Sequence, residues 1–277
     1  MRIRFVGLSI VVMLWAAVPA RAAGGPPPFY LSLGDSLAQG VQWSPLTHTD
    51  IITTDGYVDD LDKIYTQVIP GLQLAKLGCP GETTTSMIHG NALCYPVGMN
   101  QLDLAIAFLQ DPRYRVAFIT LDIGANDVEG CVSATGIDAA CVQAGLNSVA
   151  VNLPLIVSKL RRAAPHTPIV AMNYYDPFLA LWALGVNGPK LALQSLEVAT
   201  AFNVLLESVY GIFRVPVADV AAAFQTYNLL PMPGEDVPVD VFRILSLTWM
   251  TVQDIHPNHW GYWVIADAFA KKLITLR

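Results

Sequence analysis

The chain has 277 residues with 16 Lys or Arg and 22 Asp or Glu, so its formal net charge is −6. An acidic chain is repelled by nucleic acid and by anionic membrane surfaces, and neither is expected as a standing partner. More than half of the residues are hydrophobic, and no linker, repeat or low-complexity stretch divides them, so we expect one large domain.

The first 22 residues differ in kind from the rest. Two arginines precede the apolar run Phe5–Val18, and small residues follow it. This order is typical of a secretory signal peptide, here cleaved after Ala20 or Ala22. The alternative is a membrane anchor, but a spanning helix needs about 20 apolar residues and the run has only about 14.

Removal of residues 1–22 would leave a mature domain of residues 23–277. It would carry 13 Lys or Arg against 22 Asp or Glu, a net charge of −9. We expect this domain to be secreted, or periplasmic, and to have no stable membrane anchor. The sequence does not determine its oligomeric state.

Five apolar segments rich in β-formers are the predicted strands. In chain order they are Phe29–Leu33, Leu72–Leu77, Val116–Asp122, Pro168–Asn173 and Val215–Ala218. Apolar residues at helical spacing occupy the intervals, at about 57–68, 102–109, 138–162, 191–210 and 259–273. Strands that alternate with helices of this length pair in parallel and carry helices on both faces. We therefore expect an α/β fold, a flavodoxin-like three-layer α/β/α sandwich with a five-stranded, mainly parallel sheet.

Such a sheet gathers its functional groups in the loops that leave the carboxyl ends of the strands. Here those loops read GDSLAQG, GCPGETTT, DIGANDVEG and NYYDP, and QDIHPNHWGY precedes the last helix. They would bring a serine, several glycines, an asparagine and a histidine to one edge of the sheet.

These residue types match the parts of a serine hydrolase. A serine hydroxyl needs a base to take its proton, and the anionic intermediate needs preorganised hydrogen-bond donors. Ser36 is the candidate nucleophile and His256 the candidate base. The donors of the oxyanion hole would be the backbone N–H groups of Ser36 and Gly81 and the side-chain amide of Asn126.

On these motifs the chain resembles the SGNH hydrolases of the GDSL family. The matching residues are GDSL at Gly34–Leu37, the glycine Gly81, GAND at Gly124–Asp127 and HPN at His256–Asn258. They occur in the family's order and span nearly all of the mature chain. The resemblance implies a flavodoxin-like fold, ester hydrolysis without a cofactor, and an oxyanion hole from serine, glycine and asparagine.

One position departs from the family pattern. The family has aspartate three residues before the histidine, where this chain has Gln253, and the nearest aspartate is Asp254. If the loop is kinked, Asp254 can still reach Nδ1 of His256 and complete a triad. Alternatively, a backbone carbonyl near Gln253 accepts that hydrogen bond and leaves a Ser–His dyad.

The four cysteines, Cys79, Cys94, Cys131 and Cys141, are an even number in a chain expected to be exported, which indicates two disulfides. Three connectivities are possible, and we favour Cys79–Cys94 with Cys131–Cys141 because these pairs close the shortest loops. No cysteine or histidine pair has the spacing of metal ligands, so no metal site is predicted. Each disulfide would restrain a loop with an oxyanion donor, or would simply stabilise the fold.

The segment Asp176–Pro189 is more apolar than a connecting loop needs to be. It could line an acyl-chain pocket, with Leu181 and Trp182 as the candidate contacts, or form a buried helix. Asp35 is expected to shape the nucleophile turn, and Asp127 to have a structural role, such as capping the segment that follows it.

The sequence therefore predicts a secreted serine hydrolase that cleaves carboxylic esters of small molecules or lipids through an acyl-enzyme, without cofactor. The alternatives are a carbohydrate acetylesterase, which would have a shallow polar site, and a non-catalytic binding domain that retains the fold.

Overall fold

The computed structural model describes residues 25–275, and the predicted signal peptide, residues 1–22, lies outside them. The central sheet has five strands, in chain order β1 (Pro28–Gly34), β4 (Gln73–Lys76), β5 (Arg115–Asp122), β8 (Ile169–Met172) and β9 (Val217–Ala218). Their order across the sheet is β4-β1-β5-β8-β9, and every neighbouring pair is parallel. This is the flavodoxin-like order, in which the first strand of the sheet lies between the second and the third. The predicted fold class is confirmed.

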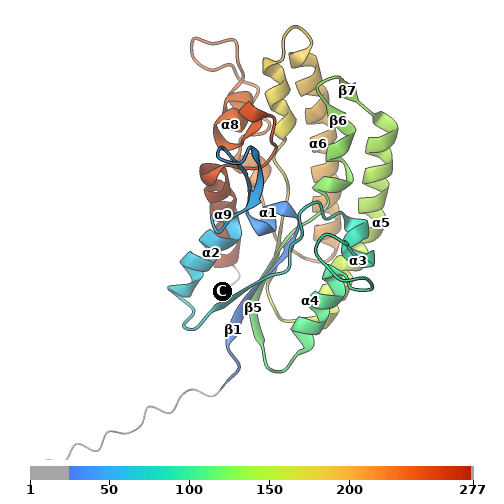
Figure 1. Ribbon diagram of the computed structural model, residues 1–277, viewed down its shortest axis with the longest axis vertical. Coiled ribbons are helices and arrows are strands. Elements are labelled where there is room, and N and C mark those ends of the chain that lie inside the picture. The colour runs from blue at the N-terminus through green and yellow to red at the C-terminus, as the bar shows by residue number, and fades with distance from the viewer. Residues whose placement is uncertain (1–24, 276–277) are drawn as a thin grey trace, which may run out of the picture.

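Helices cover both faces of the sheet. Those that match the predicted helical segments are α2 (Tyr57–Thr66), α4 (Gln101–Gln110), α5 (Ala139–Ala163), α6 (Gly188–Ile212) and α9 (His259–Ile274). The shorter ones are α1 (Ser36–Gln39), α3 (Thr84–His89), α7 (Val220–Ala223), α8 (Val239–Leu247) and the 3₁₀ turns η1 (Ala125–Asp127), η2 (Glu129–Cys131), η3 (Pro177–Ala183) and η4 (Met250–Val252). In Figure 1, α2 and α9 lie on one side of the sheet and α3 to α6 on the other, which makes three layers.

The core explains why these segments could be recognised. All seven residues of β1 are buried, so this strand reads as a continuous apolar run rather than an alternating one. On α5 the buried positions Val149, Leu153, Ile156 and Leu160 recur at helical spacing and pack into the core. Among the described residues α5 is the one helix long and apolar enough to cross a membrane, and in this fold its apolar stripe faces the protein interior.

Two small hairpins were not predicted. Strand β2 (Val41–Ser44) pairs antiparallel with β3 (Thr49–Ile52), and β6 (Val132–Ser133) with β7 (Gly136–Ile137). All four residues of β3 are exposed, so no core face imposes an apolar pattern on them. The first hairpin follows α1 directly and therefore lies at the carboxyl edge of the sheet, beside the predicted site.

Candidate active site

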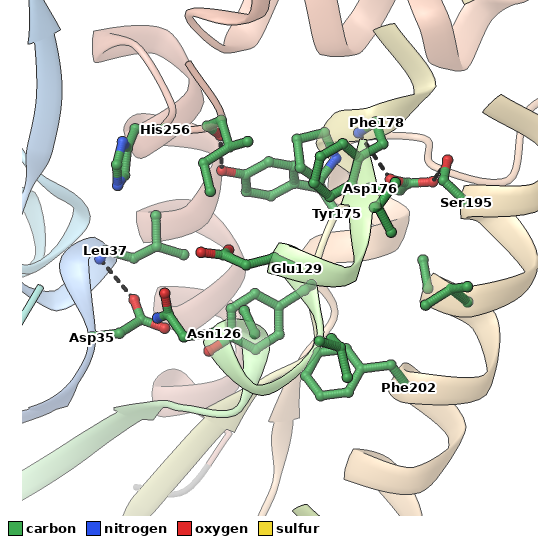
Figure 2. A pocket seen from close by; sticks show the side chains of 18 of the residues that line it. Asp35, Leu37, Asn126, Glu129, Tyr175, Asp176, Phe178, Ser195, Phe202 and His256 are labelled. Carbon is green, nitrogen blue, oxygen red and sulfur yellow. Dashed lines mark hydrogen bonds between the residues drawn. The ribbon is translucent and has the colours of Figure 1, made fainter. Parts of the chain in front are cut away.

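The nucleophile turn is built on the last residue of β1. Gly34 has a φ of +145°, and a Cβ at this position would lie 2.1 Å from the backbone oxygen of Asp122, so no other residue fits. Asp35 then caps α1, because its Oδ1 accepts a hydrogen bond from the N–H of Leu37 at 2.9 Å (Figure 2). The turn places Ser36 at the first position of α1. Asp35 thus shapes this turn, as predicted.

A buried polar network holds this turn in place. The side chain of Gln101 accepts from the N–H of Gly34 at 2.7 Å and donates to its carbonyl oxygen at 2.9 Å. Asp122 accepts hydrogen bonds from the N–H of Ala38 and the hydroxyl of Tyr57. Burial raises the pKa of Asp122 to about 7, and burial together with the charge of Asp122 raises the pKa of Asp35 well above its usual value. Since two buried carboxylates so close repel each other, the pair favours retaining a proton at neutral pH.

The histidine predicted as base lies against the serine. Nε2 of His256 is 3.0 Å from Oγ of Ser36, although the two residues are 220 positions apart in the chain. Nδ1 of His256 is 3.1 Å from Oδ1 of Asp254, and the same oxygen accepts the backbone N–H of His256 at 2.9 Å. Gln253 has a φ of +65°, and this left-handed residue supplies the kink that a D-x-H spacing needs. Asp254, rather than a backbone carbonyl near Gln253, is therefore the hydrogen-bond partner of Nδ1 of His256.

A second carboxylate, which the sequence analysis missed, lies on the same side of the imidazole. Oδ2 of Asp50, on β3, is 3.9 Å from Nδ1 of His256, and the carboxyl group of Asp50 is hydrogen bonded to that of Asp254. This hydrogen bond, followed by burial and the charge of Asp254, raises the pKa of Asp50 to about 6. No local pattern in the sequence marks Asp50, because its partners lie on a loop some 200 residues away.

These carboxylates set the protonation of the histidine. Burial lowers the pKa of His256, but the hydrogen bond to Asp254 and the charges of Asp254 and Asp50 outweigh burial, so the pKa lies above its usual value. Burial raises the pKa of Asp254, yet its hydrogen bonds to His256 and Asp50 hold it below its usual value. Asp254 is therefore ionised and able to stabilise an imidazolium at neutral pH.

The two remaining predicted donors lie on adjoining loops. Gly81 has a φ of +74°, in the turn between β4 and α3, and Asn126 lies on η1. The amide nitrogen of Asn126 donates to the backbone oxygen of Glu82 at 3.1 Å, and an amide nitrogen carries two hydrogens, so one remains for an oxyanion. Ser36, Gly81, Asn126 and His256 all line one pocket, so the structure brings the predicted residues together.

The same two loops are tied together by an aspartate. Asp127 accepts hydrogen bonds from the backbone N–H and from the hydroxyl of Thr84, both at 2.8 Å. Thr84 opens α3, directly after the turn that carries Gly81. Asp127 thus has a structural role, as predicted, but it binds α3, which precedes it in the chain, and does not cap the segment that follows it. It ties the Gly81 and Asn126 loops together.

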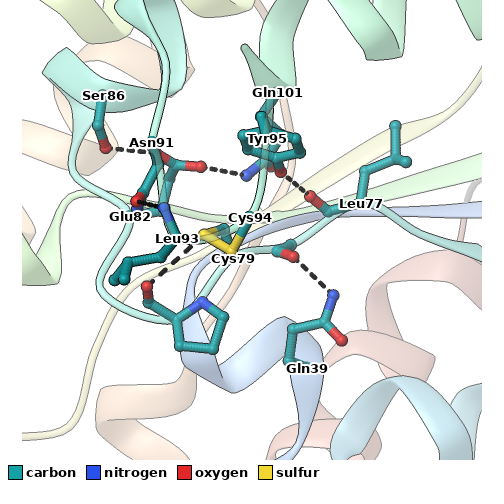
Figure 3. The surroundings of a disulfide bond; sticks show 12 residues. Gln39, Leu77, Cys79, Glu82, Ser86, Asn91, Leu93, Cys94, Tyr95 and Gln101 are labelled. Carbon is teal, nitrogen blue, oxygen red and sulfur yellow. Dashed lines mark hydrogen bonds between the residues drawn. A yellow bond between two sulfur atoms is a disulfide. The ribbon is translucent and has the colours of Figure 1, made fainter. Parts of the chain in front are cut away.

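Both predicted disulfides are present. Cys79 is bonded to Cys94 and Cys131 to Cys141, the pairing with the shortest loops. Figure 3 shows that the first bond holds the loop after β4 against the segment that follows α3, where the hydroxyl of Tyr95 also donates to the backbone oxygen of Leu77. The second bond ties η2 to the first turn of α5.

A pocket opens beside Ser36, with an empty volume of about 690 Å³ that includes open solvent at its mouth. Aromatic side chains dominate its wall (Figure 2). They are Tyr174, Tyr175, Phe178 and Phe202. Of the segment Asp176–Pro189, only its first three residues line this pocket. Leu181 and Trp182, the contacts named from sequence, do not line it; they pack behind its wall, in a small apolar cluster with Val132 and Phe178, which do.

A second pocket, of about 570 Å³ counted in the same way, lies on the hairpin side. Val41, Asp50, Ile51, Ile52, Pro80 and Gly81 line it, and it shares Ser36, Asn126, Glu129, Ile255 and His256 with the first. Ser36 therefore stands between two pockets, which is the arrangement an ester requires for its acyl and alcohol parts.

The acids around the histidine also satisfy the distance criterion for a metal site. One ligand atom each of Asp50, Asp254 and His256 lies within 4.8 Å of the others. The hydrogen bonds that these side chains make to one another account for this closeness, so the cluster does not require a metal.

Comparison with known proteins agrees with this geometry. The model of the GDSL-like Lipase/Acylhydrolase family matches residues 32–264. An extracellular lipase from Streptomyces rimosus shares 16% identity with a TM-score of 0.55, over 90% of this chain and 100% of that one. A phospholipase A1 from Streptomyces albidoflavus NA297 shares 18% identity with a TM-score of 0.54, over 88% and 98%. An acetyl-xylooligosaccharide esterase from Geobacillus shares 18% with a TM-score of 0.52, over 90% and 95%. No curated protein sequence matches the chain.

Proposed function

Because the chain belongs to the GDSL-like lipase/acylhydrolase family, we propose that it is a secreted serine hydrolase that cleaves carboxylic esters through an acyl-enzyme. The observation that carries the proposal is the 3.0 Å contact between Oγ of Ser36 and Nε2 of His256, with Asp254 behind Nδ1. A serine, a base and an acid in this order form the relay of a serine hydrolase. Two disulfides and the signal-like N-terminus support export.

The reaction follows from this geometry in two halves. Oγ of Ser36 attacks the ester carbonyl carbon while Nε2 of His256 takes the hydroxyl proton. The bond to the alcohol oxygen then breaks, and His256 passes the proton to the departing alkoxide. Water repeats the sequence on the acyl-enzyme, which releases the acid and restores Ser36.

In each half of the reaction, positive charge develops on the imidazole of His256 and negative charge on the carbonyl oxygen of the ester. The imidazolium is stabilised by Asp254, whose carboxylate is hydrogen bonded to Nδ1. The oxyanion is placed to accept from the N–H groups of Ser36 and Gly81 and from the free amide hydrogen of Asn126. Each such donor contributes roughly 10²–10³ in rate. The chain's own groups thus supply every step, and the proposal needs no cofactor.

Labelling with a fluorophosphonate probe separates an enzyme from a non-catalytic binding domain. We expect the protein to be labelled at Ser36 and to hydrolyse p-nitrophenyl butyrate, and Ser36→Ala and His256→Ala to lose both. Ser195→Ala is the matched control, because Ser195 lines the same pocket but donates to Asp176 and has no histidine partner. Labelling that survives in Ser36→Ala would exclude this mechanism.

The acyl chain is proposed to occupy the aromatic pocket, because its wall is apolar and adjoins Ser36. This favours esterase or lipase activity over a carbohydrate acetylesterase, which would need a shallow polar site. Rates on p-nitrophenyl esters of two to twelve carbons test it. Phe178→Ala should change the preferred chain length, whereas Phe242→Ala, at a half-exposed position on α8 that lines neither pocket, should not. An unchanged profile in Phe178→Ala would reject this assignment.

A further inference from the structure

One charged side chain belongs to both pockets and has no part in the mechanism above. Glu129, on η2, lines the aromatic pocket and the hairpin-side pocket, together with Ser36, Asn126, Ile255 and His256. Figure 2 shows its side chain extending across the aromatic pocket toward Leu37, below Tyr175. A substrate in either pocket must therefore pass its carboxylate.

The carboxylate of Glu129 is without a close partner. Among residues 25–275 it makes no hydrogen bond and no ion pair, although it is only partly exposed. Burial raises the pKa of Glu129, while the charge of His256 lowers it and that of Asp254 raises it. A partly desolvated carboxylate has lost some of its hydration, so a bound ligand that brings a hydrogen-bond donor or a positive charge is favoured over one that brings neither.

The surroundings favour a positive charge as that donor. Neither pocket is lined by a lysine or an arginine among the described residues, whereas Asp35, Asp50, Glu129 and Asp176 line one or both. Of these, Asp35 and Asp176 already accept backbone N–H groups, and burial raises the pKa of Asp176 to about 7. Because those two acids favour the protonated form, the attraction for a cation comes mainly from Glu129 in the aromatic pocket and from Asp50 in the other, and any positive charge on His256, which lines both pockets, opposes it.

The aromatic wall adds to this preference. Tyr174, Tyr175, Phe178 and Phe202 line the pocket into which Glu129 extends. A ring presents a negative face, and several rings beside a carboxylate form the kind of site that binds ammonium groups. The same rings can also contact a neutral hydrocarbon chain, so the aromatic wall alone does not distinguish a cationic substrate from a neutral one. The charge of Glu129 would make that distinction.

We propose that Glu129 makes this site selective for esters that carry a cationic nitrogen a few bonds from the scissile carbonyl. This inference rests on the proposed ester hydrolysis and narrows its substrate class. The positive group could belong to the alcohol, as in a choline ester, or to the acyl group, as in a trimethylammonio acid. In both cases the recognition is the same, a charge-assisted contact with Glu129 beside aromatic rings.

Matched pairs of esters test the proposal. Butyrylcholine is compared with 3,3-dimethylbutyl butyrate, in which carbon replaces the charged nitrogen. The p-nitrophenyl ester of 4-(trimethylammonio)butyrate is compared with that of 5,5-dimethylhexanoate. We expect kcat/KM to favour the cationic member of at least one pair by about tenfold. The pair that shows the preference tells whether the cation belongs to the alcohol or the acyl group.

Substitution of the glutamate links the preference to Glu129. In Glu129→Gln we expect the ratio of the two kcat/KM values to fall to near unity. Because the ratio compares two esters on the same variant, a general loss of activity cancels. Glu197→Gln is the matched control, since Glu197 is exposed on α6, outside both pockets, and the change of charge is the same. Its ratio should equal that of the unchanged protein.

Two results would overturn the inference and leave the proposed function standing. One is hydrolysis of the neutral esters as fast as, or faster than, their cationic counterparts. The other is a cationic preference that Glu129→Gln retains. Failure to hydrolyse any of the four esters, together with no labelling of Ser36 by the fluorophosphonate, would instead overturn the proposed function itself and with it the present inference.

Discussion

The turn that carries Ser36 and the loop that carries His256 meet at one point but are held there differently. Around Ser36, the neighbours Asp35, Leu37 and Ala38 are all buried; Asp35 accepts the N–H of Leu37 within the turn, and the N–H groups of Asp35 and Ala38 donate to Asp122 of the sheet. Around His256, Gln253 is exposed, and the imidazole is held by Asp254 and by Asp50 from an exposed strand. Ser36 is thus held by a tightly packed, buried turn, whereas His256 is held by carboxylates that solvent partly reaches.

This comparison predicts that substitutions on the serine side act mainly on folding, and those on the histidine side mainly on rate and its pH dependence. Four changes, from the largest expected effect to the smallest, test the contrast.

The largest effect is expected from Gly34→Ala. The added Cβ would lie 2.1 Å from the backbone oxygen of Asp122, at a φ of +145°, so β1 or β5 must move. We expect the free energy of unfolding to fall by about 4 kcal/mol or more, or no folded protein at all. Urea unfolding measures this, with Gly130→Ala as control because a Cβ there meets nothing within 4 Å. Equal midpoints for the two variants would show that the turn is not held by packing.

Asp254→Asn should lose activity without losing the fold. The amide cannot stabilise an imidazolium and favours the wrong tautomer, and loss of a triad acid lowers kcat by roughly 10⁴. The expected result is such a loss with a melting temperature near that of the unchanged protein. Activity within a few-fold of that of the unchanged protein would instead support the Ser–His dyad, with Asp254 in a structural role.

Reduction of the Cys79–Cys94 disulfide should affect both the stability of the fold and the turnover. Its loop of 15 residues contributes about 3 kcal/mol of stability in the chain-entropy account. Because this bond restrains the loop of Gly81, we expect reduction to lower turnover before near-UV dichroism is lost. The double variant Cys131→Ser with Cys141→Ser distinguishes the two bonds. If turnover and dichroism are lost together, the bond only stabilises the fold.

The smallest effect is expected from Asp50→Asn. Asp50 lies 3.9 Å from Nδ1 of His256, and its negative charge helps raise the pKa of the imidazole. Without that charge the pKa of His256 falls, so the neutral base persists to lower pH. The acid limb of kcat/KM should therefore move down by about half a pH unit, with only a few-fold change at neutral pH. An acid limb that stays in place, or moves up, would show that Asp50 does not act on His256.

Much of the fold could be predicted because its central strands are buried on both faces, β1 and β8 throughout and β5 over its last five residues. Such strands read as continuous apolar runs, and all five lie where the runs are. The loops after them carry Ser36, Gly81 and Asn126, and parallel strands necessarily bring those loops to one edge. The disulfide pairing also followed from chain distance alone. The signal peptide stays a prediction, as does the catalytic role of each site residue.

The hairpin β2–β3 and its Asp50 could not be predicted in this way. Exposed strands carry no apolar pattern, and the contact between Asp50 and His256 joins positions about 200 residues apart. Glu129 lies only three residues after Asn126, but nothing in the sequence indicates that its carboxylate lacks a hydrogen-bond partner. Leu181 and Trp182 were wrong as pocket contacts, because the direction of a side chain on η3 depends on what packs around it.

The amino-acid sequence by itself determined the parallel sheet, the order of its loops and the chemical groups those loops carry. These depend on hydrophobic periodicity and on residue type, which are local properties. Only the tertiary structure decided which carboxylate faces Nδ1 of His256, where the two pockets open and which acidic side chain lines both of them. Those depend on backbone turns such as the left-handed Gln253 and on contacts between distant segments, where a shift of an ångström makes or breaks a hydrogen bond.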